Sequence, residues 1–315
     1  MRGIVPPTTV PLFLAEDRVA ELLDLDQLIP ALERALIDFS SGRVVQPLRS
    51  VVRVAEHSGW FGLMPAVYGD VFGAKLVTVF PDNAARGVHT HHALIQLFRA
   101  ATGEPIAILD GRHITAWRTA AVSAIATREL ANPQARVLAI LGSGVQARTH
   151  FHALKTVRSF QEVRVWSPTE AHARGFAAEI GAAYLSAEEA VRDADVIVTA
   201  TAAIEPILRG AWLKPGAYVN AVGAIGPVAR ELDEELMQSA AVVVESRESA
   251  RHESAEIAKS GAPVYAELGE LLAGAVPTPS TRIVVYKSLG IAIEDLVAAR
   301  LVYERACGQA EQSPL

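Results

Sequence analysis

A glycine-rich turn is the first segment of this sequence whose residue types and spacing point to chemistry. The apolar run Val137–Leu141 leads into Gly142-Ser-Gly-Val-Gln-Ala147, which has the spacing G-x-G-x-x-A, and a helical pattern follows. Glycines at these positions permit a tight turn and let the backbone approach a pyrophosphate, which the N–H groups and the dipole of the helix then stabilise. Because a second strand pattern begins about 20 residues later, we predict a dinucleotide site.

The tip of that second strand bears on which dinucleotide is bound. The segment Val163-Arg-Val-Trp-Ser-Pro-Thr169 has no Asp or Glu where NAD enzymes usually hold the ribose 2′-hydroxyl. A hydroxyl-rich tip leaves room for a 2′-phosphate, and Arg148 at the helix start is a candidate for the charge that would pair with it. We therefore expect NADPH, with NADH as the alternative. The cofactor-binding residues expected from this motif are Gly142, Gly144, Val145, Gln146, Ala147, Arg148, Ser167 and Thr169.

Three cations stand in otherwise apolar surroundings. Arg49 precedes a strand pattern, Lys75 lies in Gly-Ala-Lys-Leu-Val-Thr-Val-Phe, and Arg118 lies in an alanine-rich helix pattern. Arginine can pair with a carboxylate through two parallel hydrogen bonds, so such residues are candidates for holding an anionic substrate. The alternative reading, in which each is a solvated charge on an amphipathic face, stays open on spacing alone.

A histidine run, His89-Thr-His-His92, is a weaker candidate for chemistry. His89 and His91 would share one face of a strand, but zinc needs three or more ligands, and neither a second cysteine nor an H-E-x-x-H pattern is present. We expect no metal and assign the run to cofactor contact or strand packing.

The elements that position these residues fall into two patterns. Strand signals separated by short turns lie between residues 49 and 110 and predict a mainly antiparallel sheet. From Arg136 strands alternate with helices, which predicts a doubly wound parallel sheet of the Rossmann type, and a final helix is expected from Ile291 to Cys307. The acidic run Glu231-Leu-Asp-Glu-Glu235 is expected to be a solvated helix start.

Composition narrows the class of protein. Half of the 315 residues are hydrophobic and a fifth are charged, which is typical of a packed globular chain. The net charge of −6 and the lack of a Lys/Arg run argue against a nucleic-acid partner. With one cysteine, Cys307, and no apolar stretch of about 18 residues, a cytoplasmic protein without a membrane span is expected.

Beyond these motifs, the sequence resembles the ornithine cyclodeaminase/mu-crystallin family over nearly its whole length, and within it the ketimine reductases more than the cyclodeaminases. The stretches that carry the resemblance are Gln46-Pro-Leu-Arg-Ser50, Leu63-Met-Pro65, Lys75-Leu-Val77, Asp110-Gly111, Ile114–Thr127, Leu141–Ala147, Glu205-Pro-Ile207, Asn220-Ala-Val-Gly223, Glu231–Glu234 and Lys287-Ser-Leu-Gly290.

The resemblance implies roles and an architecture. It implies that Arg49, Lys75 and Arg118 hold a substrate carboxylate, with Lys75 and Arg118 at the reaction centre. It places further residues around the cofactor, namely Thr90, His91, Thr201 in the Thr199–Ala202 loop, Val222 and Ser288. It also implies a mixed α+β substrate-binding and dimerisation domain (residues 1–118 and 288–315), a Rossmann domain (119–287) and a homodimer.

Two departures from the family pattern indicate the reaction. Cyclodeaminases of the family have a Glu just before Leu-Met-Pro, where this sequence has Gly62, and an Asp where it has Ile225. An aliphatic residue cannot move protons, whereas net reduction of an imine by NADPH needs neither acid. We therefore expect reduction of Δ1-piperideine-2-carboxylate or Δ1-pyrroline-2-carboxylate, faster at mildly acidic pH, with Lys75 or water as proton donor. The alternatives are an amino-acid dehydrogenase, a cyclodeaminase, or a binding protein for a small ligand of the thyroid-hormone type.

Overall fold

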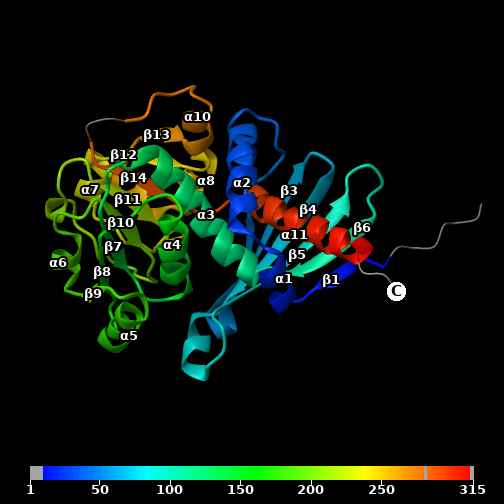
Figure 1. Ribbon diagram of the computed structural model, residues 1–315, viewed down its shortest axis with the longest axis horizontal. Helices are drawn as coiled ribbons and strands as arrows, with labels where there is room; N and C mark the ends of the chain where they lie inside the picture. Colours follow the sequence, from blue (N-terminus) through cyan, green and yellow to red (C-terminus); the bar gives the residue numbers. More distant parts are fainter. Residues whose placement is uncertain (1–9, 280–281, 313–315) are drawn as a thin grey trace, which may run out of the picture. The chain divides into compact units, whose positions relative to one another are not determined.

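The computed structural model describes residues 10–279 and 282–312, which form two compact units, each with its own sheet (Figure 1). The first unit contains the described residues of Met1–Leu28, Arg43–Thr115 and Ala292–Leu315. The second contains Ile29–Gly42 and the described residues of Ala116–Ile291. The domain boundaries expected after residues 118 and 287 stay a prediction. Residues 1–9 and 313–315 of the expected substrate-binding domain lie outside the described part of the chain.

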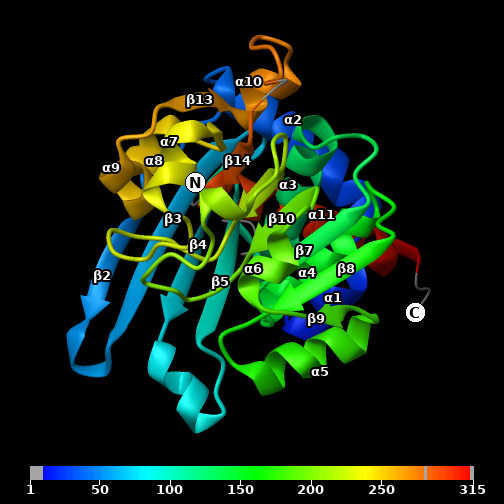
Figure 2. The ribbon, with the colours of Figure 1, turned by 90° about the vertical axis from the view of Figure 1, so that its left-hand side faces the viewer.

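The first unit is built on a six-stranded sheet of order β1-β6-β5-β4-β3-β2, whose middle strands lie side by side in Figure 2. Its strands are β1 (Leu12–Leu14), β2 (Ser50–Val54), β3 (Gly59–Tyr68), β4 (Val71–Val79), β5 (His91–Arg99) and β6 (Pro105–Asp110). All neighbours pair antiparallel except β1 and β6, so the mainly antiparallel sheet is confirmed. Helix α11 (Ala292–Gln312) packs on β3, β4 and β5, and α1 (Glu16–Leu22) packs on β6.

Strand alternation decides which side chains of this sheet are buried. Met64, Lys75 and Ile95 are register partners on β3, β4 and β5, and all three are buried. Leu63 and Leu94, one position away on their strands, are 37% and 42% exposed. Lys75 therefore belongs to the buried face, although it is a charged residue.

The second unit is a doubly wound α/β sheet, which confirms the expected fold class. Its eight strands pair in parallel in the order β13-β12-β14-β11-β10-β7-β8-β9. They are β7 (Val137–Leu141), β8 (Glu162–Trp166), β9 (Ala183–Tyr184), β10 (Val196–Thr199), β11 (Tyr218–Ala221), β12 (Ala241–Val244), β13 (Val264–Glu267) and β14 (Val284–Lys287). Most of these strands are short runs of valine, leucine, isoleucine and alanine buried on both faces, as parallel strands covered by helices require.

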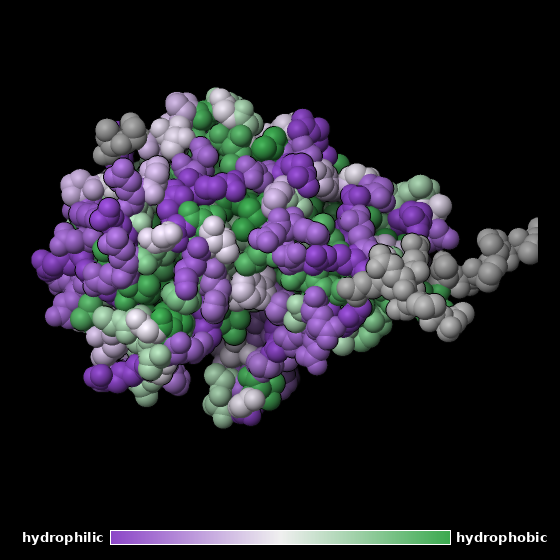
Figure 3. Space-filling view, viewed as in Figure 1, coloured by the Kyte–Doolittle hydropathy of each residue, from purple (hydrophilic) through white to green (hydrophobic). Residues whose placement is uncertain are grey.

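Helices cover both faces of this sheet. They are α3 (Arg112–Leu130), α4 (Val145–Lys155), α5 (Glu170–Ile180), α6 (Ala187–Val191), α7 (Glu234–Ser239), α8 (Arg247–Glu253), α9 (Ala255–Ser260) and α10 (Leu268–Leu272), with most of α2 (Leu25–Ser40). The surface over this unit in the view of Figure 3 is mainly hydrophilic. No helix in the described part of the chain has both the length and the apolar character needed to cross a bilayer.

Candidate functional site

The predicted glycine turn lies at the carboxyl end of β7, where the strand order reverses between β7 and β10. Gly142 has a φ of +141°, and a Cβ added there would lie 2.4 Å from the carbonyl oxygen of Ala200, just after β10. Gly144 is the N-cap of α4, and a Cβ added to it would meet nothing within 4 Å. A tight turn that opens onto the start of a helix at a switch point is the geometry that holds a pyrophosphate.

The three residues after Gly144 differ in their exposure to solvent and in their hydrogen bonds. Val145 is 63% exposed, Ala147 is buried, and the buried Oε1 of Gln146 has no hydrogen-bond partner. An unsatisfied buried acceptor is rare in proteins and marks a place where a bound group can donate a hydrogen bond. The turn and this acceptor thus fit a dinucleotide.

The tip of β8 is hydroxylic, as expected, and is linked to the turn. Ser143 Oγ donates to Ser167 Oγ over 2.9 Å, while Thr169 is the exposed N-cap residue of α5. Arg148 donates to the carbonyl oxygen of Ser143 and also pairs with Glu179 at 2.7 Å. Arg148 therefore lies in the first turn of α4, and its charge already has an acidic partner.

A buried carboxylate holds the ends of β10 and β11. Glu231 is fully buried, and its oxygens accept from Thr199 Oγ1 at 2.8 Å, Thr201 N at 2.6 Å and Gly223 N at 2.7 Å. Burial raises the pKa of this carboxyl, against the effect of nearby Lys287. The expectation of a solvated run was therefore wrong for Glu231, although Asp233 does cap α7 through Leu236 N.

The same network continues to β14. Glu256 Oε1 accepts from the backbone N–H of Glu231 at 2.7 Å, and its Oε2 lies 2.6 Å from Lys287 Nζ, with both side chains fully buried. Lys287 also donates to the carbonyl oxygen of Ala224 over 2.6 Å. Two carboxylates and one ammonium thus fix the loops that follow β10, β11 and β14. These loops contain the expected residues Thr201, Val222 and Ser288.

A second buried carboxylate, Glu245 at the end of β12, organises the loop after β14. It accepts from Ser288 Oγ at 2.9 Å, from Leu289 N at 3.1 Å and from Gly290 N at 3.2 Å. Gly290 has a φ of +71°, and a Cβ added there would lie 2.3 Å from a guanidinium nitrogen of Arg118. Gly290 therefore leaves room for Arg118, which is 5% exposed, so the solvated reading of this cation is wrong.

Lys75 is also buried, and its neighbour is an acid that the sequence did not single out. Its Nζ lies 2.7 Å from Oδ2 of Asp295 in the first turn of α11, with side chains 2% and 1% exposed. A solvated Lys75 is excluded, because the ammonium is enclosed between the sheet and α11. No local pattern predicts this pair, since Asp295 lies 220 residues further along the chain (295 − 75).

The remaining expected residues of the first unit are less enclosed. Arg49 is half-buried just before β2, Thr90 is exposed and accepts from Phe80 N through its carbonyl at 2.8 Å, and His91 begins β5. The rings of His89 and His92 meet edge to face at 6.1 Å. Within the described part of the chain, no three or more histidine, cysteine or acidic side chains are grouped to hold a metal.

Gly62 lies on the buried face of β3, two residues from Met64, the register partner of Lys75. A Cβ at Gly62 would approach Val77 Cγ1 at 3.0 Å and the ring of Trp60 at 3.1 Å. The space that an acidic side chain would need is thus taken by apolar groups. Ile225, in the place of the cyclodeaminases' Asp, is 42% exposed.

One histidine outside the expected set connects the turn to α3. His150 is fully buried; its Nδ1 lies 2.7 Å from the carbonyl oxygen of Gln146 and its Nε2 lies 2.9 Å from Ser123 Oγ. A carbonyl only accepts, so Nδ1 carries the proton and Nε2 accepts from the serine. Burial lowers the pKa of His150 to about 4, so the ring is neutral at physiological pH.

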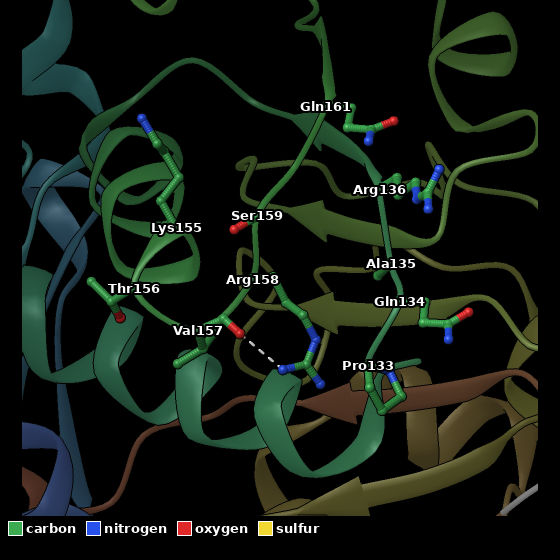
Figure 4. A pocket seen from close by; sticks show the side chains of 10 residues that line it. All are labelled: Pro133, Gln134, Ala135, Arg136, Lys155, Thr156, Val157, Arg158, Ser159 and Gln161. Carbon is green, nitrogen blue, oxygen red and sulfur yellow. Dashed lines mark hydrogen bonds between the residues drawn. The ribbon is translucent and has the colours of Figure 1, made fainter.

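A cavity of about 510 Å³ lies at the opposite, amino end of β7 (Figure 4). Arg158 enters it, and its guanidinium donates to the carbonyl oxygens of Val157 at 2.9 Å and of Arg128 and Ala131 at 3.0 Å. Arg158 therefore caps the carboxyl end of α3, and none of the residues that line the cavity belongs to the expected site.

Comparison with known proteins settles the family. The family model described as ornithine cyclodeaminase/mu-crystallin family matches residues 9–310. The chain belongs to this family. Ketimine reductase mu-crystallin of Rattus norvegicus is 48% identical over 303 residues, which cover 93% of this chain and 97% of the relative. The resemblance noted in the sequence is thereby confirmed.

Two solved structures of similar proteins agree with the fold. Δ1-pyrroline-2-carboxylate reductase of Thermococcus litoralis, solved with NADH and L-proline, has a TM-score of 0.90, with 34% identity over 95% of this chain and 98% of that one. An archaeal alanine dehydrogenase dimer with bound NAD also has a TM-score of 0.90, with 32% identity over 95% of this chain and 97% of that one.

Proposed function

We propose that this member of the ornithine cyclodeaminase/mu-crystallin family is an NAD(P)H-dependent oxidoreductase that reduces the C=N bond of cyclic imino carboxylates. Its substrates are Δ1-piperideine-2-carboxylate and Δ1-pyrroline-2-carboxylate, and its products are the cyclic amino acids. The observation that carries the proposal is the burial of two cations, Lys75 and Arg118, at 3% and 5% exposure. The names of its reductase relatives support the same reaction.

The residues of the proposed site fall into a group that binds the substrate and a group that binds the cofactor. Arg49, Lys75 and Arg118 bind the substrate carboxylate, because cations shielded from water attract an anion strongly and the arginines can orient it through bidentate pairing. The turn Gly142–Gly144 and the start of α4 bind the pyrophosphate, and the loops with Thr201, Val222 and Ser288 line the cofactor. The reduced nicotinamide, when bound, supplies the hydride. Thr90 and His91 are assigned to the cofactor site on the family pattern.

NADPH is proposed as the preferred cofactor. The tip of β8 supplies hydroxyl groups from Ser167 and Thr169 and no acid. An acidic side chain at this position would repel the 2′-phosphate of NADPH, so its lack leaves that phosphate room to bind. Arg148 lies in the first turn of α4, just after Ser143, which is hydrogen-bonded to Ser167 at this tip. Its pair with Glu179 is solvent-exposed, so the ion pair is weak enough to rearrange.

The test is to incubate the protein with a panel of cyclic and linear imino acids and either NADPH or NADH. Oxidation of the cofactor is measured as the loss of absorbance of the reduced nicotinamide. The proposal predicts oxidation of the cofactor with both cyclic imino carboxylates and little with imines that lack a carboxylate. Unchanged absorbance with every cyclic imine would refute it and leave a binding protein. Release of ammonia from ornithine would instead identify a cyclodeaminase, which Gly62 and Ile225 disfavour.

An alanine-type dehydrogenase is the second candidate, supported by the 32% identity to the archaeal enzyme. It uses the same hydride transfer on an open-chain amino acid. Reduction of NAD with L-alanine, at a kcat/KM above that of cyclic imine reduction, would favour it.

A homodimer is proposed through the face of the first unit's sheet that α11 does not cover. That face exposes apolar side chains, including Leu63, Val67 and Leu94 at 37%, 43% and 42%. An extended apolar patch of this kind is typical of a protein interface. Light scattering after gel filtration tests it; a monomer for the wild type would refute it.

A further inference from the structure

The buried partner of Lys75 bears on a question that the proposed function leaves open, namely which group supplies the proton of the reduction. Lys75 Nζ and Asp295 Oδ2 are 2.7 Å apart, and both side chains are almost fully enclosed. An amine removed from water tends to lose its proton, unless a carboxylate beside it stabilises the ammonium. At this separation the Coulomb attraction in a low-dielectric interior favours the charged pair strongly.

The neighbours of Lys75 on the adjacent strands carry no charge. Its register partners on β3 and β5 are Met64 and Ile95, and neither titrates. From α11, both Glu294 and Asp295 are buried, at 1% exposure each. Asp295, whose Oδ2 lies 2.7 Å from Nζ, therefore favours the ammonium form of Lys75.

The start of α11 is itself fixed to the segment that carries Arg49. Gln46 Oε1 accepts from the backbone N–H of Ile293 over 2.8 Å, which satisfies one of the unpaired N–H groups of the helix end. Asp295 lies in that first turn, where the helix dipole stabilises a carboxylate. Its negative charge is therefore held in place before any substrate binds.

We infer that Asp295 is the positioning residue of Lys75, which it keeps as a fixed ammonium that binds the substrate carboxylate and does not protonate the imine. This inference rests on the proposed function. The substrate reacts as the iminium, which already carries its proton from water. Hydride adds to the carbon of the C=N bond, the π electron pair moves onto nitrogen, and Lys75 keeps all its protons.

Three variants test the inference. Asp295→Asn removes the charge with little change of shape, and Asp295→Glu keeps the charge. Glu304→Gln is the control on the same helix, since Glu304 forms a solvent-exposed pair with Arg300. The readouts are calorimetric binding of L-proline to the enzyme with oxidised cofactor, kcat and KM for the cyclic imine across pH, and cofactor affinity alone.

Loss of the carboxylate should weaken the cation that holds the substrate. For Asp295→Asn we expect L-proline affinity and kcat/KM to fall by about 10-fold or more, mostly through KM, with cofactor affinity unchanged. The fall in kcat/KM at alkaline pH should begin at a lower pH than in the wild type, because Lys75 then loses its proton more easily. Asp295→Glu should recover most of the loss, and Glu304→Gln should match the wild type.

Two results would overturn the inference. The first is an affinity of Asp295→Asn for L-proline no lower than that of Glu304→Gln. The second is a kcat of Asp295→Asn that is higher than that of the wild type near neutral pH, which is the result expected if Lys75 donated the proton and did so more easily without its carboxylate partner. If Asp295→Asn does not fold, Lys75→Met is compared with the double variant Lys75→Met/Asp295→Asn. Because Asp295 acts through Lys75, the double variant should be no less active; a further loss would contradict the inference. Failure of the proposed function is distinct, because the wild type would then reduce no cyclic imine.

Discussion

Gly290→Ala is expected to damage substrate binding by moving Arg118. The added methyl group would lie 2.3, 2.6 and 2.9 Å from the two terminal nitrogens and the central carbon of the Arg118 guanidinium. These distances are shorter than any real contact, so the guanidinium must move. A charge-assisted hydrogen bond contributes roughly 1.5–3 kcal/mol, and its loss corresponds to a fall in kcat/KM of about 10- to 150-fold.

Backbone strain must be separated from this displacement. Gly290 has a φ of +71°, and alanine in that region costs roughly 1–2 kcal/mol. Gly261, the C-cap of α9, is the matched control, because its φ is +65° and an added Cβ would meet nothing within 4 Å. Gly261→Ala should therefore lower the free energy of unfolding by about as much as the backbone strain in Gly290→Ala does. Its kcat/KM should equal that of the wild type.

The assay is steady-state reduction of a cyclic imino carboxylate, with cofactor affinity and denaturant unfolding measured in parallel. Gly290→Ala should raise KM for the imine while the Kd of the cofactor stays within about twofold of the wild type. If Gly290→Ala retains the wild-type KM, or if Gly261→Ala loses as much activity, Arg118 does not bind substrate in the way described.

Three further predictions concern stability, the cofactor and the reaction. His150 should make the protein less stable in acid, because its pKa is about 4 in the folded protein and an ordinary 6.5 in the unfolded chain. As the pH falls, the unfolded chain therefore takes up the proton first. The free energy of unfolding should fall by about 2 kcal/mol between about pH 7 and pH 5. Denaturant titrations should show this fall reduced in His150→Gln and kept in His152→Gln, its exposed neighbour on α4; equal pH dependence would contradict the assignment. Arg148→Ala should raise the KM of NADPH by about 5- to 10-fold and leave that of NADH unchanged, and parallel changes would refute the role of Arg148. Gly62→Glu should reduce imine turnover and release no ammonia from ornithine, because Val77 and Trp60 occupy the space around the new side chain; ammonia release would overturn that reasoning.

Local patterns were enough to predict the framework of the second unit. The run Val137–Leu141, the glycine turn and the alternation of strands with helices follow from backbone geometry and burial over short stretches, and the parallel sheet confirms them. The antiparallel sheet of the first unit followed in the same way from short turns between strands. The exact strand ends did not follow from these patterns; β3, for example, continues through Pro65 to Tyr68.

The buried charges were beyond this reasoning, because their partners come from distant parts of the chain. Glu231 resembles a solvated residue before a helix, yet its oxygens accept from the loops after β10 and β11. Asp295 similarly resembles an ordinary acidic residue in a first helical turn. The signal that was available is indirect: an unexplained cation such as Lys75 in an apolar strand implies that an acid lies somewhere opposite it.

Transfer of deuterium is the measurement that tests the central claim most directly. The protein is incubated with Δ1-piperideine-2-carboxylate and NADPH carrying two deuterium atoms at C4 of the nicotinamide, and the cyclic amino acid is analysed by mass spectrometry and NMR. Direct hydride transfer to the C=N carbon predicts one deuterium in each product molecule, on the α-carbon. A product without deuterium on that carbon, or no product from any cyclic imino carboxylate, would contradict the account.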